Sequence, residues 1–159
     1  MQPANKFTRF YNFLANLGLV IRDDPPKVID LTGREWGPAV NGLRLSLREL
    51  PREDPMQVTG VSVVMRNIGT TSKQITVPPW VFFYRIHGLE LTPYGRQFMN
   101  AGPRGQNTDL TLKPGDAIET DLPLSTMYNM RAPGQYRVQV SAPLPDTTEL
   151  QSNEIAVRV

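Results

Sequence analysis

Residues 109–122 (DLTLKPGDAIETDL), 124–142 (LSTMYNMRAPGQYRVQVSA) and 152–159 (SNEIAVRV) form a succession of short segments in which apolar and polar residues alternate. Turns at Lys113–Gly115 and Ala132–Gly134 divide these segments, because Pro and Gly favour the backbone conformations of tight turns. Short alternating segments separated by Pro/Gly turns are typical of antiparallel strands in an all-β domain. We therefore predict a β-sandwich.

The alternation extends upstream and predicts one domain over residues 41–159. Two strands are expected over Val58–Arg66 and Lys73–Val77, and Trp80–Ile86 is apolar enough on both faces for a central strand. Before them, three leucines alternate with polar residues, as in a strand with one buried face: Leu43, Leu45 and Leu47. The predicted fold is an immunoglobulin-like antiparallel β-sandwich of about seven to nine strands with an N-terminal amphipathic helix.

The N-terminal residues 1–22 follow a helical period. Apolar side chains recur three and four positions apart, on one face of the predicted helix: Phe7, Phe10, Tyr11, Leu14 and Leu17. We expect this helix to pack on the sandwich, to dock on a partner protein or to lie on a membrane surface. A secretion signal is a weaker alternative, because Asn12 and Asn16 interrupt the apolar run. Residues 23–40 are predicted as a linker with a short edge strand at Val28–Ile29.

Composition excludes several classes of function. The net charge is +2, and no basic stripe with exposed aromatic residues is present, so nucleic acid is not an expected partner. There is no Cys, and the one histidine, His87, cannot build a nitrogen-ligand metal site, so no metal or other cofactor is expected. No phosphate-binding loop or nucleophile elbow occurs, and we interpret His87 as structural. The sequence therefore predicts a protein that is not an enzyme.

The longest irregular stretch of the body is predicted over residues 93–107. Long loops on a rigid scaffold often carry binding residues. This stretch holds four candidate contact residues: Tyr94, Arg96, Phe98 and Arg104. Together with the aromatic face of the N-terminal helix, they form the predicted partner-binding set.

Several turn and core residues resemble a bacterial sandwich signature. The residues that carry the resemblance are Leu112-Lys113-Pro114-Gly115, Asp121-Leu122, Tyr128, Pro133-Gly134, Tyr136 and Ser152-Asn153. The pattern, over roughly residues 41–159, resembles the non-catalytic β domain of deuterolysin-type, lysine-specific zinc endopeptidases. It is also similar to the bacterial intracellular proteinase inhibitor family. The resemblance implies an immunoglobulin-like fold and no peptidase activity, because the His-Glu-x-x-His helix is missing.

We hypothesise a non-enzymatic protein–protein interaction module, an accessory or structural subunit that docks on a larger assembly through residues 5–22 and 93–107. One alternative is a proteinase inhibitor that inserts a loop such as Gly95–Gly105 into a protease cleft. Another is a module that binds a membrane surface through the N-terminal helix. The body is expected to be soluble and without a transmembrane span, since the apolar run from Phe10 to Ile21 is shorter than the roughly 20 residues needed. No residue pattern assigns the partner or the compartment.

Overall fold

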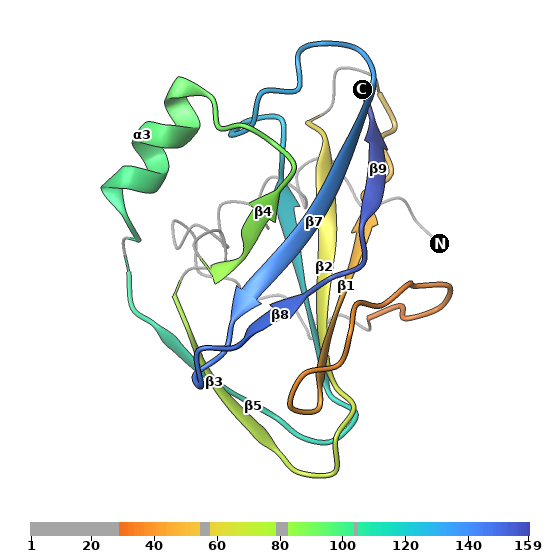
Figure 1. The fold of residues 1–159 in the computed structure, drawn as a ribbon, viewed down its shortest axis with the longest axis vertical. Coiled ribbons are helices and arrows are strands. Elements are labelled where there is room, and N and C mark those ends of the chain that lie inside the picture. Colours follow the sequence, from red (N-terminus) through yellow and green to blue (C-terminus); the bar gives the residue numbers. More distant parts are fainter. Residues whose placement is uncertain (1–28, 55–57, 79–82, 104) are drawn as a thin grey trace.

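The computed structural model describes residues 29–54, 58–78, 83–103 and 105–159 (Figure 1). These residues form a mostly β structure of antiparallel sheets, as the alternating pattern predicted. The predicted helix over residues 1–22 and the linker up to residue 28 lie outside the described residues. Of the predicted edge strand, Ile29 is described and is not in a strand.

The first sheet has three strands in the order β1-β2-β6. Its members are β1 (Leu43–Glu49), β2 (Gly60–Asn67) and β6 (Ala117–Pro123). All pairs are antiparallel, and the register sets Leu45 opposite Met65 and Met65 opposite Ile118. The strand predicted over Val58–Arg66 is therefore present as β2, with its ends shifted by one or two residues.

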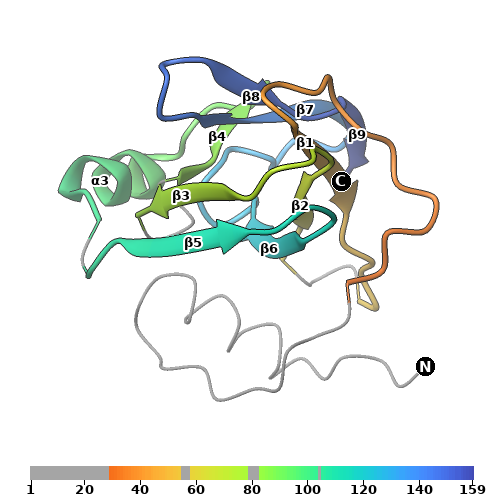
Figure 2. The same ribbon diagram turned by 90° about the horizontal axis from the view of Figure 1, so that it is seen from below.

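The second sheet is built on β7. This long strand (Gln135–Pro143) pairs antiparallel with β4 (Arg85–His87), with β8 (Glu149–Gln151) and with β9 (Ile155–Arg158). Figure 2 shows β7 and β8 in one layer and β2 and β6 in the other. The two remaining strands, β3 (Lys73–Val77) and β5 (Thr108–Leu112), pair only with each other among the described strands. The bounds of β3 confirm the prediction from sequence.

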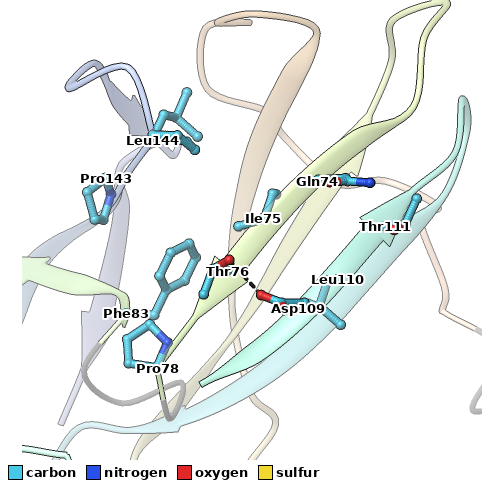
Figure 3. Close-up of a pocket in the computed structure, with 11 residues that line it drawn as sticks. Gln74, Ile75, Thr76, Pro78, Phe83, Asp109, Leu110, Thr111, Pro143 and Leu144 are labelled. Carbon is cyan, nitrogen blue, oxygen red and sulfur yellow. Dashed lines mark hydrogen bonds between the residues drawn. The ribbon is translucent and has the colours of Figure 1, made fainter. Parts of the chain in front are cut away.

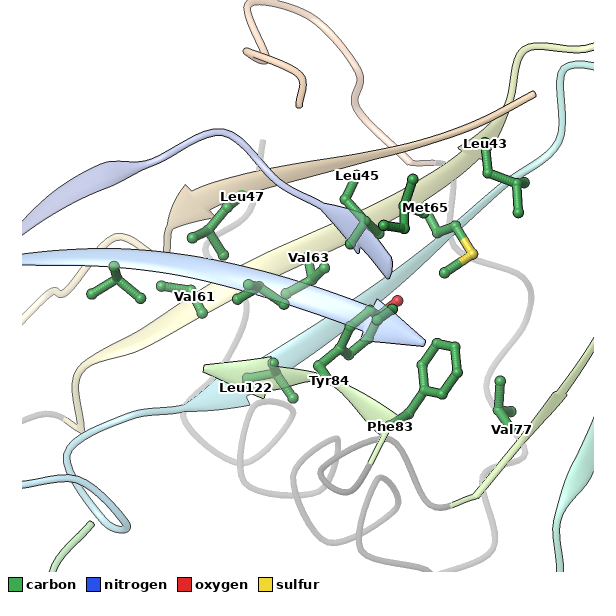
Figure 4. Close-up of a cluster of buried hydrophobic side chains, with 14 of the residues drawn as sticks. Leu43, Leu45, Leu47, Val61, Val63, Met65, Val77, Phe83, Tyr84 and Leu122 are labelled. Atoms are coloured by element: carbon green, nitrogen blue, oxygen red, sulfur yellow. The ribbon is translucent and has the colours of Figure 1, made fainter. Parts of the chain in front are cut away.

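The hydrophobic core lies between the layers. The alternating leucines of β1 and three core residues of β2 are all at most 3% exposed: Leu43, Leu45, Leu47, Val61, Val63 and Met65. Val138 and Val140 of β7 cover them from the other layer and are fully buried. In Figure 4 the side chains of Phe83 and Tyr84 point into the same interior. Burial of such side chains, at about 1.5–3 kcal/mol each, is the main source of stability.

The predicted central strand over Trp80–Ile86 is wrong in extent. Strand β4 begins only at Arg85, and residues 79–82 lie outside the described part of the chain. Phe83 and Tyr84 precede β4, and their rings contact each other edge to face with centroids 5.1 Å apart. Successive side chains of a strand point to opposite faces, so two neighbouring rings that enter one core require a break in the strand.

Tyr136 closes the corner at the start of β7. Its hydroxyl donates a 2.6 Å hydrogen bond to the carbonyl of Ala132, four residues upstream. This bond ties the Tyr136 hydroxyl to the backbone of the preceding turn. Tyr128 is partly buried, and its N–H donates to the Leu124 carbonyl at 2.8 Å, as in one turn of a helix.

A side-chain amide closes the free edge of β1 against the second sheet. The N–H of Leu47 donates to Asn153 Oδ1 at 2.7 Å, and Asn153 Nδ2 donates to the Leu47 carbonyl at 3.0 Å. Beside it, the Ser152 hydroxyl accepts from the N–H of Val140 at 2.9 Å, and the Ser152 N–H donates to the Val140 carbonyl at 2.8 Å. Ser152 and Asn153 lie between β8 and β9, so this short segment bonds to both sheets.

Arg34 holds the segment before β1 against the outer face of the first sheet. Its buried guanidinium donates to Ser62 Oγ at 2.6 Å and to Glu119 Oε1 at 3.2 Å. The Ser46 hydroxyl donates to the carbonyl of Glu35 at 2.6 Å and adds a second contact. Burial lowers the pKa of Arg34, and the nearby Glu119 carboxylate raises it in compensation. The end of the predicted linker is thus bonded to β1, β2 and β6.

Replacing Asn153 should separate the edges of the two sheets. Asn153→Ala leaves the N–H and carbonyl of Leu47 without their partner, and an unsatisfied buried polar group costs about 1–3 kcal/mol. We expect the free energy of unfolding, measured by urea titration, to fall by about that amount. The matched control is Asn107→Ala, an exposed residue expected to change stability by less than about 0.5 kcal/mol. Equal effects of the two substitutions would contradict the role assigned to Asn153.

Two tyrosines of the core should make the free energy of unfolding depend on pH in the alkaline range. Burial raises the pKa of Tyr128 to about 12 and raises that of Tyr84 further, where the nearby Thr120 side chain offsets only part of the rise. Folding favours the neutral phenols. Their contribution to the free energy of unfolding is therefore complete at pH values below the unfolded-state pKa of about 10, and it is lost as the pH rises toward 12. Phenolate absorbance should show a late component there, together with falling stability. A titration completed by about pH 11 in the folded protein would refute this.

Candidate functional site

The predicted partner-binding residues are only partly described. Phe7, Phe10, Tyr11, Leu14 and Leu17 lie outside the described residues, and so does Arg104. The structure places the remaining three, Tyr94, Arg96 and Phe98, on one helix.

That helix corrects the prediction of an irregular stretch over residues 93–107. Helix α3 runs from Pro93 to Ala101, and only the residues after it are irregular. The Thr92 hydroxyl caps the helix by accepting the N–H of Gly95 at 3.0 Å, and Pro93 occupies the first turn, where no N–H is needed. Gly102 then ends the helix with a φ of 75°. These start and stop residues were visible in the sequence, but the three glycines of the stretch favoured a loop.

Helix α3 is attached to the body at its first turn. The N–H of Thr92 donates to the carbonyl of Met127 at 2.9 Å. Gly95 is buried against the same carbonyl, and a Cβ at this position would lie 2.2 Å from the Met127 oxygen. The absence of a side chain at Gly95 therefore permits the close approach of the helix to the turn over residues 124–128. Figure 1 shows α3 at one side of the sheets, with most of its length away from them.

The helix carries an aromatic pair in which Tyr94 is the ring exposed to solvent. Tyr94 is 60% exposed, and its ring centroid lies 6.3 Å from that of Phe98, which is half-buried. The two residues are one helical turn apart and therefore share a face. Arg96 lies on a different face, and its guanidinium donates to the Leu91 carbonyl at 2.9 Å. The structure thus brings two of the predicted contact residues together and uses the third to bond the segment before the helix.

A groove that was not predicted separates β3 from the turn between β7 and β8. Its volume is about 820 Å³. Four apolar side chains line it: Ile75 of β3, Leu110 of β5, Phe83 before β4 and Leu144, which follows β7. In Figure 3, the Phe83 ring lies between Ile75 on one side and Pro143 and Leu144 on the other. The groove combines residues about 70 positions apart, so no local pattern could predict it.

The rim of the groove is polar on the β3–β5 side and proline-rich on the other sides. The Thr76 hydroxyl donates to Asp109 Oδ1 at 2.6 Å across the two strands. Asp109 is the only charged residue among the described residues of the lining. Pro78 follows β3, and Pro143 and Pro145 flank Leu144 on the opposite wall. The site therefore offers apolar surface with one carboxylate, an arrangement suited to binding rather than to acid–base chemistry.

His87 belongs to a polar cluster on the second sheet. Its Nε2 lies 2.7 Å from Ser141 Oγ, and that hydroxyl donates to Glu149 Oε1 at 2.6 Å. Ser141 is fully buried, and its proton points to the carboxylate rather than to the imidazole. In a hydrolase triad the hydroxyl instead gives its proton to the histidine. The cluster joins β4, β7 and β8, which agrees with a structural role for His87.

Within the described residues, no group of three or more His, Asp or Glu side chains is arranged to hold a metal ion. No helix in that part of the chain combines the length and apolar character needed to cross a membrane.

Adding one methyl group at Gly95 should loosen α3. In Gly95→Ala the Cβ would overlap the Met127 carbonyl, so the helix must shift, at a cost of about 1–3 kcal/mol. Amide hydrogen exchange should show loss of protection in α3, while β2 keeps its protection. Asn100→Ala, an exposed substitution on the same helix, serves as the control and is expected to be neutral or slightly stabilising because Ala favours helices. Unchanged exchange in Gly95→Ala would show that the close approach is not needed.

No known family model matches the sequence, and no curated protein matches it. We therefore infer function from the surfaces of the protein itself.

Proposed function

We propose that the chain is a non-enzymatic protein–protein interaction module that serves as an accessory or structural subunit of a larger assembly. The observation that carries the proposal is the exposed ring of Tyr94 beside the partly buried ring of Phe98, on a helix held at its first turn by Thr92 and Gly95. The contact surface formed by Tyr94 and Phe98 is called the α3 face below.

The α3 face has the chemistry of an interface anchor. Tyrosine is enriched at protein interfaces and among the residues that dominate binding energy, because its ring offers large contact area with few rotatable bonds. The contacts of Thr92 and Gly95 with Met127 hold the helix in place before binding, which reduces the entropy lost on association. A pre-ordered aromatic face is therefore better suited to docking than a flexible loop.

We also propose that the antiparallel sheets form an immunoglobulin-like sandwich, as the resemblance to the two bacterial families implied. The hydrogen bond from Tyr136 to the Ala132 carbonyl supports this, because a tyrosine bonded to upstream backbone at a strand start is a hallmark of such sandwiches. The proposed subunit also docks through the predicted helix over residues 5–22, with Phe10 and Leu14 on its apolar face.

The observed helix weighs against the proteinase-inhibitor alternative. A loop that enters a protease cleft as a substrate does must be extended there, but residues 95–101 are helical. The membrane-surface alternative rests on residues 1–22, which lie outside the described part of the chain. The α3 face is thus the surface that favours a protein partner.

The test is a quantitative pull-down from the source cell with full-length variants. Tyr94→Ala combined with Phe98→Ala should reduce recovery of a stoichiometric partner at least about tenfold, because loss of interface aromatics costs about 2 kcal/mol or more. Asn100→Ala is the matched control on another face of α3 and should retain the partner. Phe10→Ser with Leu14→Ser tests the N-terminal helix separately.

Three outcomes would argue against the proposal. Retention of every partner by the Tyr94/Phe98 variant would exclude the α3 face as the docking surface. Stoichiometric inhibition of a protease by the wild-type chain would favour the inhibitor alternative. Binding to anionic liposomes that Phe10→Ser abolishes would favour the membrane-surface alternative.

A further inference from the structure

We propose that the groove between β3 and the β7–β8 turn binds an extended segment of a partner protein, which adds as a strand to the free edge of β3. The segment would carry alternate apolar side chains and a Lys or Arg. This second site is separate from the α3 face and does not depend on it.

The edge of β3 that faces the groove is open in the described structure. Figure 3 shows β3 between β5 on one side and residues 143 and 144 on the other, and Figures 1 and 2 agree. Within the described residues, β5 is the only strand that pairs with β3. An edge strand presents unpaired backbone N–H and carbonyl groups, which can pair with another chain. The edge of β1 that does not pair with β2 is instead hydrogen-bonded by Gly37 and Asn153.

The opposite wall, residues 143–145, has no free backbone N–H to offer to β3. Pro143 and Pro145 have no N–H, and the N–H of Leu144 donates to the Thr148 carbonyl at 2.8 Å within its own turn. The wall therefore presents apolar side chains and carbonyl groups. A segment entering the groove would form hydrogen bonds with β3 and apolar contacts with this wall.

The groove lining matches the two faces of an added strand. Side chains of a strand alternate in direction, so every second residue of the segment would point toward Ile75, Phe83 and Leu144. These three side chains are at most 6% exposed, so they form a packed floor whose positions are set before a segment binds. A volume of about 820 Å³ lies within the range typical of binding sites and has room for several side chains.

Charge at the rim selects for a basic residue. Asp109 is the only charged side chain among the described lining residues. This carboxylate at the rim favours a segment that carries Lys or Arg.

The experiment selects ligands from a phage-displayed library of random peptides with the full-length chain. Enriched sequences should alternate apolar residues and include Lys or Arg. Synthetic peptides of these sequences are then measured by fluorescence polarisation, with single backbone N-methyl groups scanned along each peptide. N-methylation removes one N–H from the peptide and leaves the protein unchanged.

The expected result is an alternating effect of N-methylation, with at least about a tenfold loss of affinity at every second residue. Asp109→Lys should weaken binding of the basic peptides by a similar factor, while Asn107→Lys, at an exposed residue outside the groove lining, should have a smaller effect because no carboxylate is lost. The Tyr94/Phe98 double variant should bind the peptides with unchanged affinity, so failure here is distinguishable from failure of the α3 face.

Each contrary result overturns the proposal. No enriched sequence, or binding that is insensitive both to N-methylation and to Asp109→Lys, would show that β3 does not accept a strand. Loss of peptide binding in the Tyr94/Phe98 variant would move the site to α3. Self-association of the chain that competes with the peptides would assign the groove to a second copy.

Discussion

The paired hydrogen bonds between the Asn153 amide and the backbone of Leu47 are the contact on which the arrangement of the two sheets depends. The amide occupies the place that a neighbouring strand would take, so β1 has no open edge at this point. Its neighbour Ser152 bonds Val140 of β7 in the same short segment. One sheet edge is thus fastened to the other through two successive residues, and the core between them is closed on that side.

Similar polar contacts connect segments far apart in the chain. The fully buried Asn67 amide donates to the carbonyls of Thr71 and Leu112 and accepts from Gly69, which orders the turn into β3 and fixes the end of β5. Because β3 is positioned in this way, its groove-facing edge is held beside the β7–β8 turn. The contact of Gly95 with Met127 does the same for α3. The two proposed binding surfaces therefore sit on a body whose geometry is set before any partner arrives.

The sequence predicted local features that follow from side-chain period. The alternation of Leu43, Leu45 and Leu47 predicted the buried face of β1, and Lys73–Val77 was predicted as a strand with the observed bounds. It did not predict α3, because a nine-residue helix has little periodicity and depends on contact with Met127. The sequence also predicted too long a strand before His87, because the entry of both Phe83 and Tyr84 into one core depends on tertiary contacts. The groove depends on tertiary contacts as well and could not be predicted.

The central claim is that side-chain amides close the sheets into one cooperative body, and backbone amide hydrogen exchange at Leu47 tests it most directly. The N–H of Leu47 has a side chain, not a strand, as its acceptor. If Asn153 closes the edge, this N–H should exchange only with global unfolding, at the same opening free energy as the buried strand β2. Exchange of Leu47 at a much lower opening free energy than β2 would show that the edge opens independently and would contradict the account.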